Sequence, residues 1–377
     1  MSKTLQDYAT LINDTIQSNE INHYITTDNM CQNLGGIDTF KNINIPQGKV
    51  RSFQKDDILL SNIRLYFRKV YRAKQKGGCS SDVLVFRAKH IDSATLFAIL
   101  SSQIFTDYAC SGSQGSKMPR GNKTHMMDFK IPTINFTIAK IFNSIQNKIE
   151  NNHKINELLH KILELLYERY FVRFDFLDEN NKPYQTSGGK MKFSKELNRL
   201  IPSGWSVRFL NHKIVSTYQP KTISKTLLND SYSYSVYGGG GIIGRFTEYN
   251  HEQSEFIISC RGQCGISYLT LPKSWITGNA MVIRPTKSYT SKTYLYHTIK
   301  KYKLTNYITG SVQPQITRQN LSTMPILIPK RKTLNKWNNI SSLLWNLIHN
   351  NMQSTQTLTA LRDFLLPLLL KQQVKPQ

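Results

Sequence analysis

The residues most capable of chemistry form a glycine run at 239–244, which reads Gly-Gly-Gly-Ile-Ile-Gly. The run satisfies the G-x-G-x-x-G pattern of loops that hold the pyrophosphate of a dinucleotide. Such a loop joins a strand to a helix, and the next residues, Arg-Phe-Thr-Glu at 245–248, are a poor helix start. We therefore expect either a flexible loop near a nucleic acid, with Arg245 on a phosphate, or a plain surface turn.

Other catalytic patterns are absent from the sequence. It has no G-x-x-x-x-G-K-S/T phosphate-binding loop. Its histidines stand apart rather than at metal or triad spacing, among them His125, His212, His251 and His297. Its cysteines form no C-x-x-C pair and are Cys31, Cys79, Cys110, Cys260 and Cys264. We expect no catalytic residue, no metal and no cofactor, and an odd set of reduced thiols fits a cytoplasmic protein.

Side chains that can read base edges are concentrated in a few segments. Arg and Lys match guanine edges in the major groove of DNA, and Asn and Gln match adenine edges. The candidate DNA-binding residues of the first half are Asn62, Arg64, Tyr66, Arg68, Lys69, Gln114, Lys117, Arg120 and Asn122. Those of the second half are Arg245, Arg261, Gln263, Gln313, Gln315 and Arg318. Each of them can serve base reading or phosphate binding.

The net charge of the chain agrees with a DNA partner. Its 377 residues carry 49 Lys and Arg against 24 Asp and Glu, a formal charge of +25. This excess is spread along the chain, which favours a polyanionic partner over a single basic tail, although a charge that serves only solubility is the alternative. No apolar run approaches the ~18 residues of a membrane span, and the N-terminal residues do not resemble a secretory signal, so we expect no membrane association.

The segments that must position these residues are repeated along the chain. Ile-Leu-Leu-Ser at 58–61 matches Phe-Ile-Ile-Ser at 256–259, an offset of 198 residues. The same offset relates Val-Leu-Val at 83–85 to Met-Val-Ile at 281–283, and Arg120 and Asn122 to Arg318 and Asn320. The ends of the repeats, 130–132 and 327–329, match at 197. The chain is therefore expected to be a tandem duplication of one β-rich, loop-rich domain followed by a helix.

Each repeat ends in a long helix with heptad spacing. The predicted seam of the first helix is Ile138, Phe142, Ile145, Ile149, Asn152, Asn156, Leu159, Leu163, Leu166 and Tyr170. That of the second is Trp337, Ile340, Leu344, Leu347, Asn351, Ser354, Leu358, Leu361, Leu365 and Leu368. Both have a polar centre, so antiparallel pairing matches polar to polar. The candidate pairing residues are Ile145, Asn152 and Leu159 in the first helix and Leu347, Asn351 and Leu358 in the second. The alternative is that these asparagines face solvent or another subunit.

The length of the helices predicts how the two domains would be spaced. About 33 residues span roughly 50 Å at 1.5 Å per residue. Antiparallel pairing would place one domain at each end of the helix pair, related by a pseudo-two-fold axis. Such a separation predicts a bipartite DNA target, in which two short sequences are read and the gap between them is not.

Several stretches together resemble specificity subunits of Type I restriction enzymes. In the centre they read Tyr-Phe-Val-Arg-Phe-Asp-Phe at 170–176, Lys-Pro-Tyr at 182–184, Ser-Gly-Gly-Lys-Met at 187–191 and Ile-Pro-Ser-Gly-Trp at 201–205. In the first half they read Tyr-Ile-Thr-Thr-Asp-Asn-Met at 24–30, Gly-Gly-Ile at 35–37, Asp-Ile-Leu-Leu-Ser-Asn-Ile-Arg at 57–64 and Met-Pro-Arg at 118–120 with Asn122. The second half departs from the pattern, with Ile-Thr-Arg at 316–318.

The resemblance implies a subunit that binds double-stranded DNA and has no catalytic site. It implies two methylation subunits bound through the helices, and restriction and translocation subunits bound through that methylase core. It also implies adenine methylation and DNA cleavage by these partners. The sequence contains no Asn/Asp-Pro-Pro-aromatic loop of an amino-methyltransferase, which agrees with a non-catalytic chain.

The expected fold is mixed α+β, with two tandem target-recognition domains and two long helices that pair as an antiparallel coiled coil. The expected boundaries are 1–134 for the first domain, 135–186 for the central helix and linker, 187–331 for the second domain and 332–377 for the C-terminal helix. The alternatives are a specificity subunit of a related methyltransferase or Type II-like system, a self-contained DNA-modifying enzyme, and an adaptor whose charge is incidental.

Overall fold

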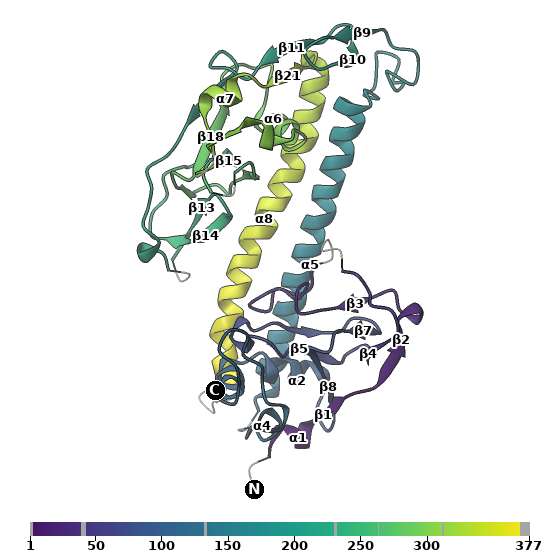
Figure 1. Ribbon diagram of the computed structural model, residues 1–377, viewed down its shortest axis with the longest axis vertical. Helices are drawn as coiled ribbons and strands as arrows, with labels where there is room; N and C mark the ends of the chain where they lie inside the picture. The colour runs from purple at the N-terminus through teal and green to yellow at the C-terminus, as the bar shows by residue number, and fades with distance from the viewer. Residues whose placement is uncertain are drawn as a thin grey trace. The chain divides into compact units, whose positions relative to one another are not determined.

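The computed structural model describes residues 3–38, 43–131, 134–229, 232–262, 264–310 and 313–369 (Figure 1). It has two compact units, one made of Met1–Ile155 with Asn351–Gln377 and the other of Asn156–Asn350. The boundary falls within the two long helices, α5 (Phe136–Tyr167) and α8 (Arg331–Leu369), so each unit contains part of both. The mixed α+β class with two globular parts and two long helices is confirmed.

Unit 1 contains two four-stranded sheets. One has the antiparallel order β1-β8-β5-β6, and the other has the order β2-β4-β7-β3, in which β3 and β7 are parallel. The strands are β1 (Ala9–Ile12), β2 (Thr15–Gln17), β3 (Tyr24–Ile25), β4 (Lys49–Phe53), β5 (Ile58–Ser61), β6 (Val70–Arg72), β7 (Gly77–Cys79) and β8 (Val83–Ala88). The helices are α1 (Leu5–Tyr8), α2 (Ser93–Leu100), α3 (Gln103–Ser111) and α4 (Lys123–Met127), with 3-10 turns η1 (Ser18–Glu20) and η2 (Leu65–Phe67).

Unit 2 repeats the first of these sheets. Its order β12-β18-β15-β16 is again antiparallel throughout, and a three-stranded sheet β14-β13-β17 lies in the same unit. The strands of the two sheets are β12 (Val215–Tyr218), β13 (Tyr234–Gly238), β14 (Gly241–Phe246), β15 (Phe256–Ser259), β16 (Ser267–Leu269), β17 (Trp275–Ile276) and β18 (Ala280–Pro285). Strand pairs complete the unit: β9 (Met191–Ser194) with β10 (Arg199–Pro202), β11 (Ser206–Phe209) with β21 (Pro325–Ile328), and β19 (Ile308–Thr309) with β20 (Gln315–Ile316).

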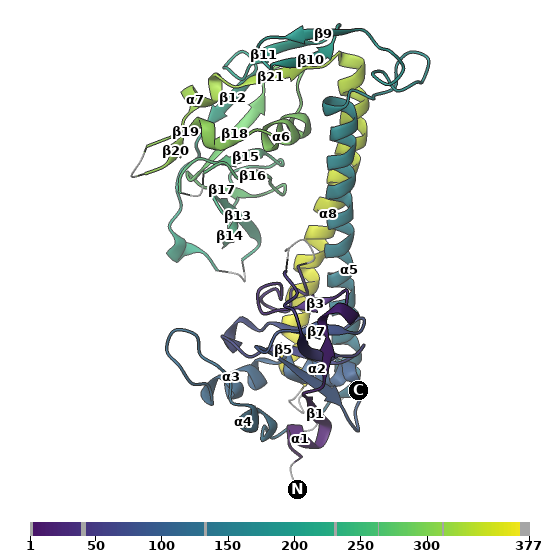
Figure 2. The same ribbon diagram turned by 45° about the vertical axis from the view of Figure 1, so that its right-hand side comes forward.

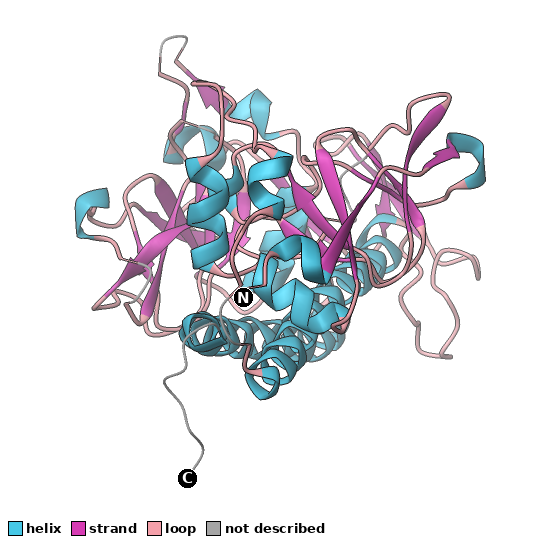
Figure 3. Ribbon diagram, turned by 90° about the horizontal axis from the view of Figure 1, so that it is seen from below, coloured by secondary structure: helices cyan, strands magenta, loops and turns pink. Residues whose placement is uncertain are grey.

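Unit 2 also contains short helices, as unit 1 does (Figures 2 and 3). They are α6 (Lys292–Lys300), α7 (Arg318–Ser322), the π-helical turn η3 (Glu168–Val172), and the 3-10 turns η4 (Lys225–Leu227) and η5 (Leu304–Tyr307). Helix α2 follows β8 and is capped by Asp92, and α6 follows β18 and is capped by Ser291. These side-chain oxygens accept the first free amides of their helices, which fixes where each helix begins.

The pairing of the strands shows where the offset between the two repeats changes. Leu59 pairs with Val85 in unit 1, whereas Ile257, the counterpart of Leu59, pairs with Val282 in unit 2. The counterpart of Val85 is therefore Val282 and not Ile283, so the offset has already fallen to 197 at β18. A loop deletion between the two strands explains the slip, because hydrogen-bonded pairing forces each strand to keep its register.

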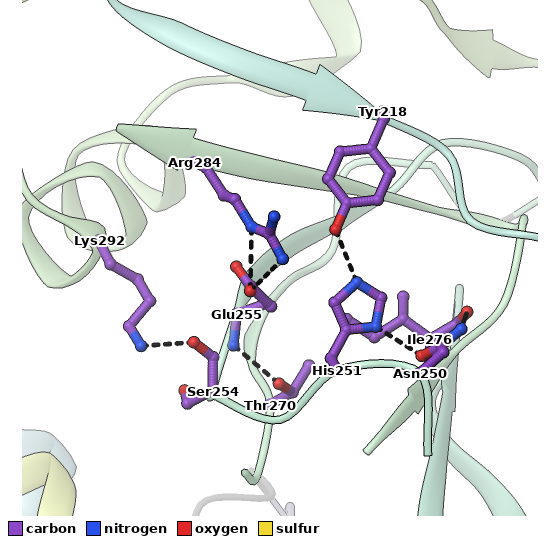
Figure 4. A network of polar contacts seen from close by, with 9 residues as sticks. All are labelled: Tyr218, Asn250, His251, Ser254, Glu255, Thr270, Ile276, Arg284 and Lys292. Atoms are coloured by element: carbon purple, nitrogen blue, oxygen red, sulfur yellow. Dashed lines mark hydrogen bonds and ion pairs between the residues drawn. The ribbon is translucent and has the colours of Figure 1, made fainter. Parts of the chain in front are cut away.

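In both repeated sheets a buried carboxylate pairs with a partly exposed arginine at the same place. Arg87 Nε lies 2.8 Å from Asp57 Oδ1 in unit 1, and Arg284 Nη2 lies 2.6 Å from Glu255 Oε1 in unit 2 (Figure 4). Each guanidinium donates two hydrogen bonds to its carboxylate. The carboxylates raise the pKa of Arg87 and of Arg284. These pairs fix the strands from which the candidate DNA-binding loops emerge.

The long helices pair antiparallel within each unit. In unit 1, Asn152 Nδ2 donates to Thr355 Oγ1 at 3.2 Å, and Arg362 donates to Gln146 at 3.2 Å. In unit 2, Asn156 Nδ2 donates to the Ile348 carbonyl at 3.3 Å, and further along α5 the ring of His160 contacts that of Trp345 and Tyr167 contacts Trp337. Residues later in α5 thus meet residues earlier in α8, with the predicted polar layer at the centre.

The seam of α5 follows the predicted heptad, but that of α8 is shifted. Ile145 and Asn152 are buried, and Leu159 and Leu358 are half-buried, as is Asn351. Leu347 is 45% exposed, however, and the neighbouring Ile348 is fully buried in its place. Ile340, Ser354 and Leu361 of the predicted seam are also exposed.

The shift in α8 has a packing cause. This helix contacts α6 as well as α5, through Trp337, Ser341 and Trp345. Together with His349 they recur at every fourth residue, and all four are buried. A helix that packs against two neighbours buries a stripe of period 3.6 rather than a strict heptad.

Candidate nucleic-acid interface

In unit 1 the structure brings the two predicted groups of DNA-binding residues together. They lie on the segment after β5 and on the segment between α3 and α4, which pair through the isolated bridge Ile63–Arg120. Arg64 N donates to the Pro119 carbonyl at 2.9 Å, and Gly121 N donates to the Asn62 carbonyl at 3.1 Å. Backbone bonds therefore hold one continuous surface from loops that are about 50 residues apart in sequence.

The side chains on this surface differ in how far they are available to a ligand. Tyr66 is 53% exposed, and Gln114, Lys117 and Asn122 are also exposed. Arg120 forms an ion pair with Asp82 at 2.9 Å, yet its side chain remains 62% exposed. An arginine oriented by a carboxylate keeps donors free for an acceptor on its open side, since the guanidinium has five N–H groups.

Other predicted residues also hold the domain together. Arg68 Nη2 donates to the Ser101 carbonyl at 2.9 Å, and burial lowers the pKa of Arg68. Lys69 Nζ donates to the Thr27 carbonyl, and Arg64 Nη2 donates to the Lys117 carbonyl at 3.3 Å. Asn122 Oδ1 accepts the amide of His125 and so begins α4. These contacts give the four residues a structural role in addition to any ligand contact.

The backbone of the loop after β5 is strained at two arginines. Arg64 and Arg68 have φ values of 50° and 49° on either side of η2. The left-handed region is costly for a residue with a Cβ, and such residues persist only where surrounding contacts fix them. Here the hydrogen bonds of both guanidinium groups provide that support.

In unit 2 the equivalent segments also meet. Arg261 and Gln315 form an isolated bridge, Ile316 N donates to the Cys260 carbonyl at 3.0 Å, and Cys264 Sγ lies 3.1 Å from the Pro314 carbonyl oxygen. Arg261 and Gln315 are exposed, as are Gln313 and Arg318. Gln263 lies outside the described residues.

The glycine run lies beside the Arg261 loop, where its first residues form a hairpin turn. It joins β13 to β14, and Gly241 has a φ of 95°, which favours glycine in the turn. A Cβ at Gly239 would lie 3.3 Å from the Arg261 carbonyl oxygen, so the turn approaches the Arg261 loop closely. No helix follows the run, which excludes the dinucleotide-binding interpretation. Arg245 lies within β14, half-buried, and donates to the Ser233 carbonyl.

The bridges correct one pairing between the repeats. Ile63 bridges Arg120 and its counterpart Arg261 bridges Gln315, so Gln315 rather than Arg318 is the counterpart of Arg120. The helix caps agree, because Asn122 caps α4 as Thr317 caps α7. The offset here is 195. The nine-residue helix α3 has only the four-residue turn η5 near its place in unit 2, which accounts for the shortened connection.

Two supporting residues were not expected from the sequence. Asp82 holds Arg120, and its carbonyl accepts the amide of Asn62 at 2.8 Å. His125 stacks on Tyr108 at 4.1 Å and bonds to its carbonyl at 2.9 Å, which fixes the chain just before Gln114. Neither residue has a sequence signal, because both act across a fold that local pattern does not encode.

A family model for the Type I restriction modification DNA specificity domain matches residues 202–361. These residues form such a specificity domain. Within it lie Arg245, Arg261, Gln313, Gln315 and Arg318, and therefore the whole converging surface of unit 2.

Two relatives extend the comparison beyond the specificity domain. The chain is 22% identical over 312 residues to the Type I restriction enzyme MjaIX specificity subunit of Methanocaldococcus jannaschii, which covers 73% of this chain and 67% of that protein. The crystal structure of a Type I restriction-modification S subunit from M. genitalium matches with a TM-score of 0.63 at 14% identity, covering 99% of this chain and 96% of the other. The second likeness shows a shared fold.

No group of three or more His, Cys, Asp or Glu side chains among the described residues is placed to hold a metal ion. None of their helices has the length and apolar character that a membrane span requires. His251 bonds to Tyr218 at 2.7 Å and to Asn250 inside the network of Figure 4, and burial lowers its pKa. Its contacts are structural ones.

Proposed function

We propose that this chain is the DNA-binding specificity subunit of a Type I restriction-modification complex in the cytoplasm. It reads a bipartite double-stranded DNA target and directs adenine methylation and DNA restriction by partner subunits. It catalyses neither reaction. Its own contribution is the choice of site, made through base edges in the major groove and secured through the phosphate backbone.

One observation carries the proposal: the exposed Arg and Gln side chains of unit 2 converge on one surface inside a matched DNA specificity domain. The counterpart loops of unit 1 converge in the same way and present Arg120 and Tyr66. Two surfaces of similar construction support two half-sites. The charge of +25 supplies the phosphate attraction that makes binding strong at low salt.

The assembly of the complex is part of the proposal. The two recognition domains would comprise 1–134 and 187–331, and 135–186 and 332–377 would supply the helices. In unit 2 both helices carry an exposed apolar stripe at helical spacing: Leu158, Ile162 and Leu165 on α5, and Ile340, Leu343 and Leu347 on α8. Apolar side chains in such a stripe favour burial against partner helices. We assign them to the methylation subunits, two per complex, with restriction subunits bound through the methylase core.

Single-molecule methylome sequencing of cells that carry this gene with its neighbouring subunit genes tests the proposal. We expect a methyl-adenine motif with two read parts and an unread gap, which disappears when this gene is deleted. A matched variant, Lys195→Gln at an exposed lysine between β9 and β10, should leave the motif unchanged. A continuous palindrome that depends on this chain would contradict the two-domain reading, and methyl transfer by the purified chain alone would contradict its non-catalytic role.

A further inference from the structure

The N-terminus of α8 lines a pocket in unit 2, and none of the candidate DNA-binding residues lines this pocket. The pocket has a volume of about 270 Å³, just below the range of drug-sized ligand sites and large enough for a small ion. One wall is the start of α8 with Lys332, Thr333 and Lys336, and another contains Trp205. Lys330 also lines it, and its side chain covers Gly204, where a Cβ would lie 2.1 Å from Lys330 Cε.

The first turn of α8 has donors without acceptors. The first backbone bond of the helix runs from Leu334 N to the Lys330 carbonyl at 3.0 Å. The amides of Arg331, Lys332 and Thr333 have no hydrogen-bond partner among the residues that the structure describes. A lysine at the position before the helix cannot accept these amides as Ser, Thr, Asp or Asn would.

The charges at this helix end have the unfavourable sign. A helix N-terminus is electropositive and is stabilised by acidic residues, yet the first turn of α8 has none. Instead, Lys330, Arg331 and Lys332 are consecutive there, with Lys336 one turn later. None of the three pocket lysines forms an ion pair with the described residues. Locally unfavourable charge that is not compensated within the fold indicates a site for an outside anion.

Two buried side chains independently indicate a ligand. Thr333 is 6% exposed and Trp205 is 2% exposed, and both line the pocket, so what remains accessible of them faces it. Neither the Thr333 hydroxyl nor the Trp205 indole N–H has a hydrogen-bond partner in the described part of the chain. Neither atom is among the fully buried unpaired donors of the described residues, so both remain accessible from the pocket and can donate to an oxygen atom that enters it.

Two carboxylates also line the pocket and limit the choice of ligand. Asp178 Oδ1 accepts the amides of Asn180 and Lys182 at 2.8 and 2.9 Å, so this oxygen is engaged in its own turn. Glu179 is exposed. Three lysines therefore face two carboxylates, and the helix end adds further positive potential, which leaves the lining suited to a compact anion.

We propose that this pocket binds a small phosphate dianion, either inorganic phosphate or the terminal phosphate of a mononucleotide. The amides and the Thr333 hydroxyl would donate to its oxygens, and Lys332 and Lys336 would neutralise its charge. The site involves none of the DNA-reading residues, so it is independent of the proposed function.

The test titrates the purified full chain with inorganic phosphate while NaCl keeps the ionic strength constant, and follows Tm and the heat of binding. We expect a saturable rise in Tm that chloride does not reproduce. Lys332→Gln and Thr333→Val should each weaken binding roughly tenfold, the effect of one charge-assisted hydrogen bond. Lys161→Gln, an exposed lysine of the same unit, should leave it unchanged. If Thr333→Val does not fold, Lys332→Gln on the exposed surface decides the matter.

Further ligands distinguish the source of the phosphate. Tighter binding of AMP than of phosphate identifies a nucleotide, and equal binding identifies the free ion. Three results would overturn the proposal: no phosphate effect beyond that of ionic strength, binding of adenosine equal to that of AMP, or displacement of bound phosphate by random-sequence duplex DNA. The last would assign these lysines to the DNA backbone.

Discussion

Two buried histidines make the folding of unit 2 sensitive to acid. His297 on α6 is 3% exposed and His349 on α8 is 7% exposed, and the Nε2 atoms of both are buried without a described partner. Burial, reinforced by Lys300, lowers the pKa of His297 to about 3. Burial, reinforced by Lys292, lowers the pKa of His349 to about 4. Glu164 faces the same cluster but is paired with Lys300 at 2.6 Å.

The sign and size of the effect follow from proton linkage. In the unfolded chain a histidine has a pKa near 6.5, so below that pH the unfolded state binds protons that the native state does not. Stability is therefore retained above pH 6.5 and falls as the pH decreases. Each histidine loses about 1.4 kcal/mol per pH unit, hence about 2 kcal/mol at pH 5 and about 4 kcal/mol for both. His160 and His251, whose pKa values burial also lowers, add to this loss.

Urea unfolding followed by tryptophan fluorescence measures this loss directly. All four tryptophans, Trp205, Trp275, Trp337 and Trp345, lie in unit 2, so the signal reports on that unit. His297→Phe keeps a ring beside Tyr167 and Trp337 and should remove about 2 kcal/mol of the loss between pH 7 and pH 5. The exposed His212→Phe should leave the pH dependence unchanged. A wild-type loss below about 1 kcal/mol, or an unchanged slope in His297→Phe, would refute the reasoning.

Three further perturbations test the fold and the interface. Arg284→Met leaves the buried Glu255 carboxylate without its partner. Because the Arg284 side chain is half-exposed, we expect unit 2 to lose about 2 kcal/mol in the same urea assay. A loss no larger than that of Lys273→Met, at an exposed pair, would contradict this. Arg261→Ala should weaken DNA binding and lower the slope of log K against log salt by about 1 if Arg261 contacts phosphate, measured by fluorescence anisotropy; an unchanged affinity would remove Arg261 from the interface. Leu158→Glu with Ile162→Glu should abolish co-purification of the methylation subunit while the fluorescence unfolding curve is retained. Lys195→Gln, at an exposed lysine outside the stripe, should leave co-purification unchanged, and co-purification in the double variant would exclude this stripe as the contact.

The long-range architecture was predictable because local patterns encode it. The heptads of α5 place Ile145 and Asn152 in the buried seam as expected, since helical periodicity depends only on neighbours along the chain. The repeat was also visible, because the strands after Asp57 and Glu255 keep similar apolar runs. What matched least well was α8, where Ile348 replaces Leu347 in the seam. The cause is α6, a neighbour that is distant in sequence.

The candidate site was predictable in composition but not in arrangement. The arginines and glutamines do gather on two surfaces, since loops after equivalent strands emerge at equivalent places. The sequence does not show which of these side chains also bond to other residues of the fold. Arg68 bonds to Ser101 and Arg120 to Asp82, across separations of 33 and 38 residues. Matching Arg120 to Arg318 by sequence also failed, since the deletion near η5 is visible only from the bridge to Gln315.

That corrected pairing has a consequence for the proposed target. The two units present a guanidinium, Arg120, and an amide, Gln315, at the same position of the same scaffold. Both side chains are exposed, and the segments that hold them are tied by equivalent backbone bridges. A forked guanidinium complements the O6 and N7 of guanine, whereas a glutamine amide complements the N6 and N7 of adenine. Two loops that share a backbone arrangement but present a guanidinium in one unit and an amide in the other favour different bases at this position. The half-sites must therefore differ in sequence if both residues contact bases, and the full target is then asymmetric even though the protein is built from a repeat.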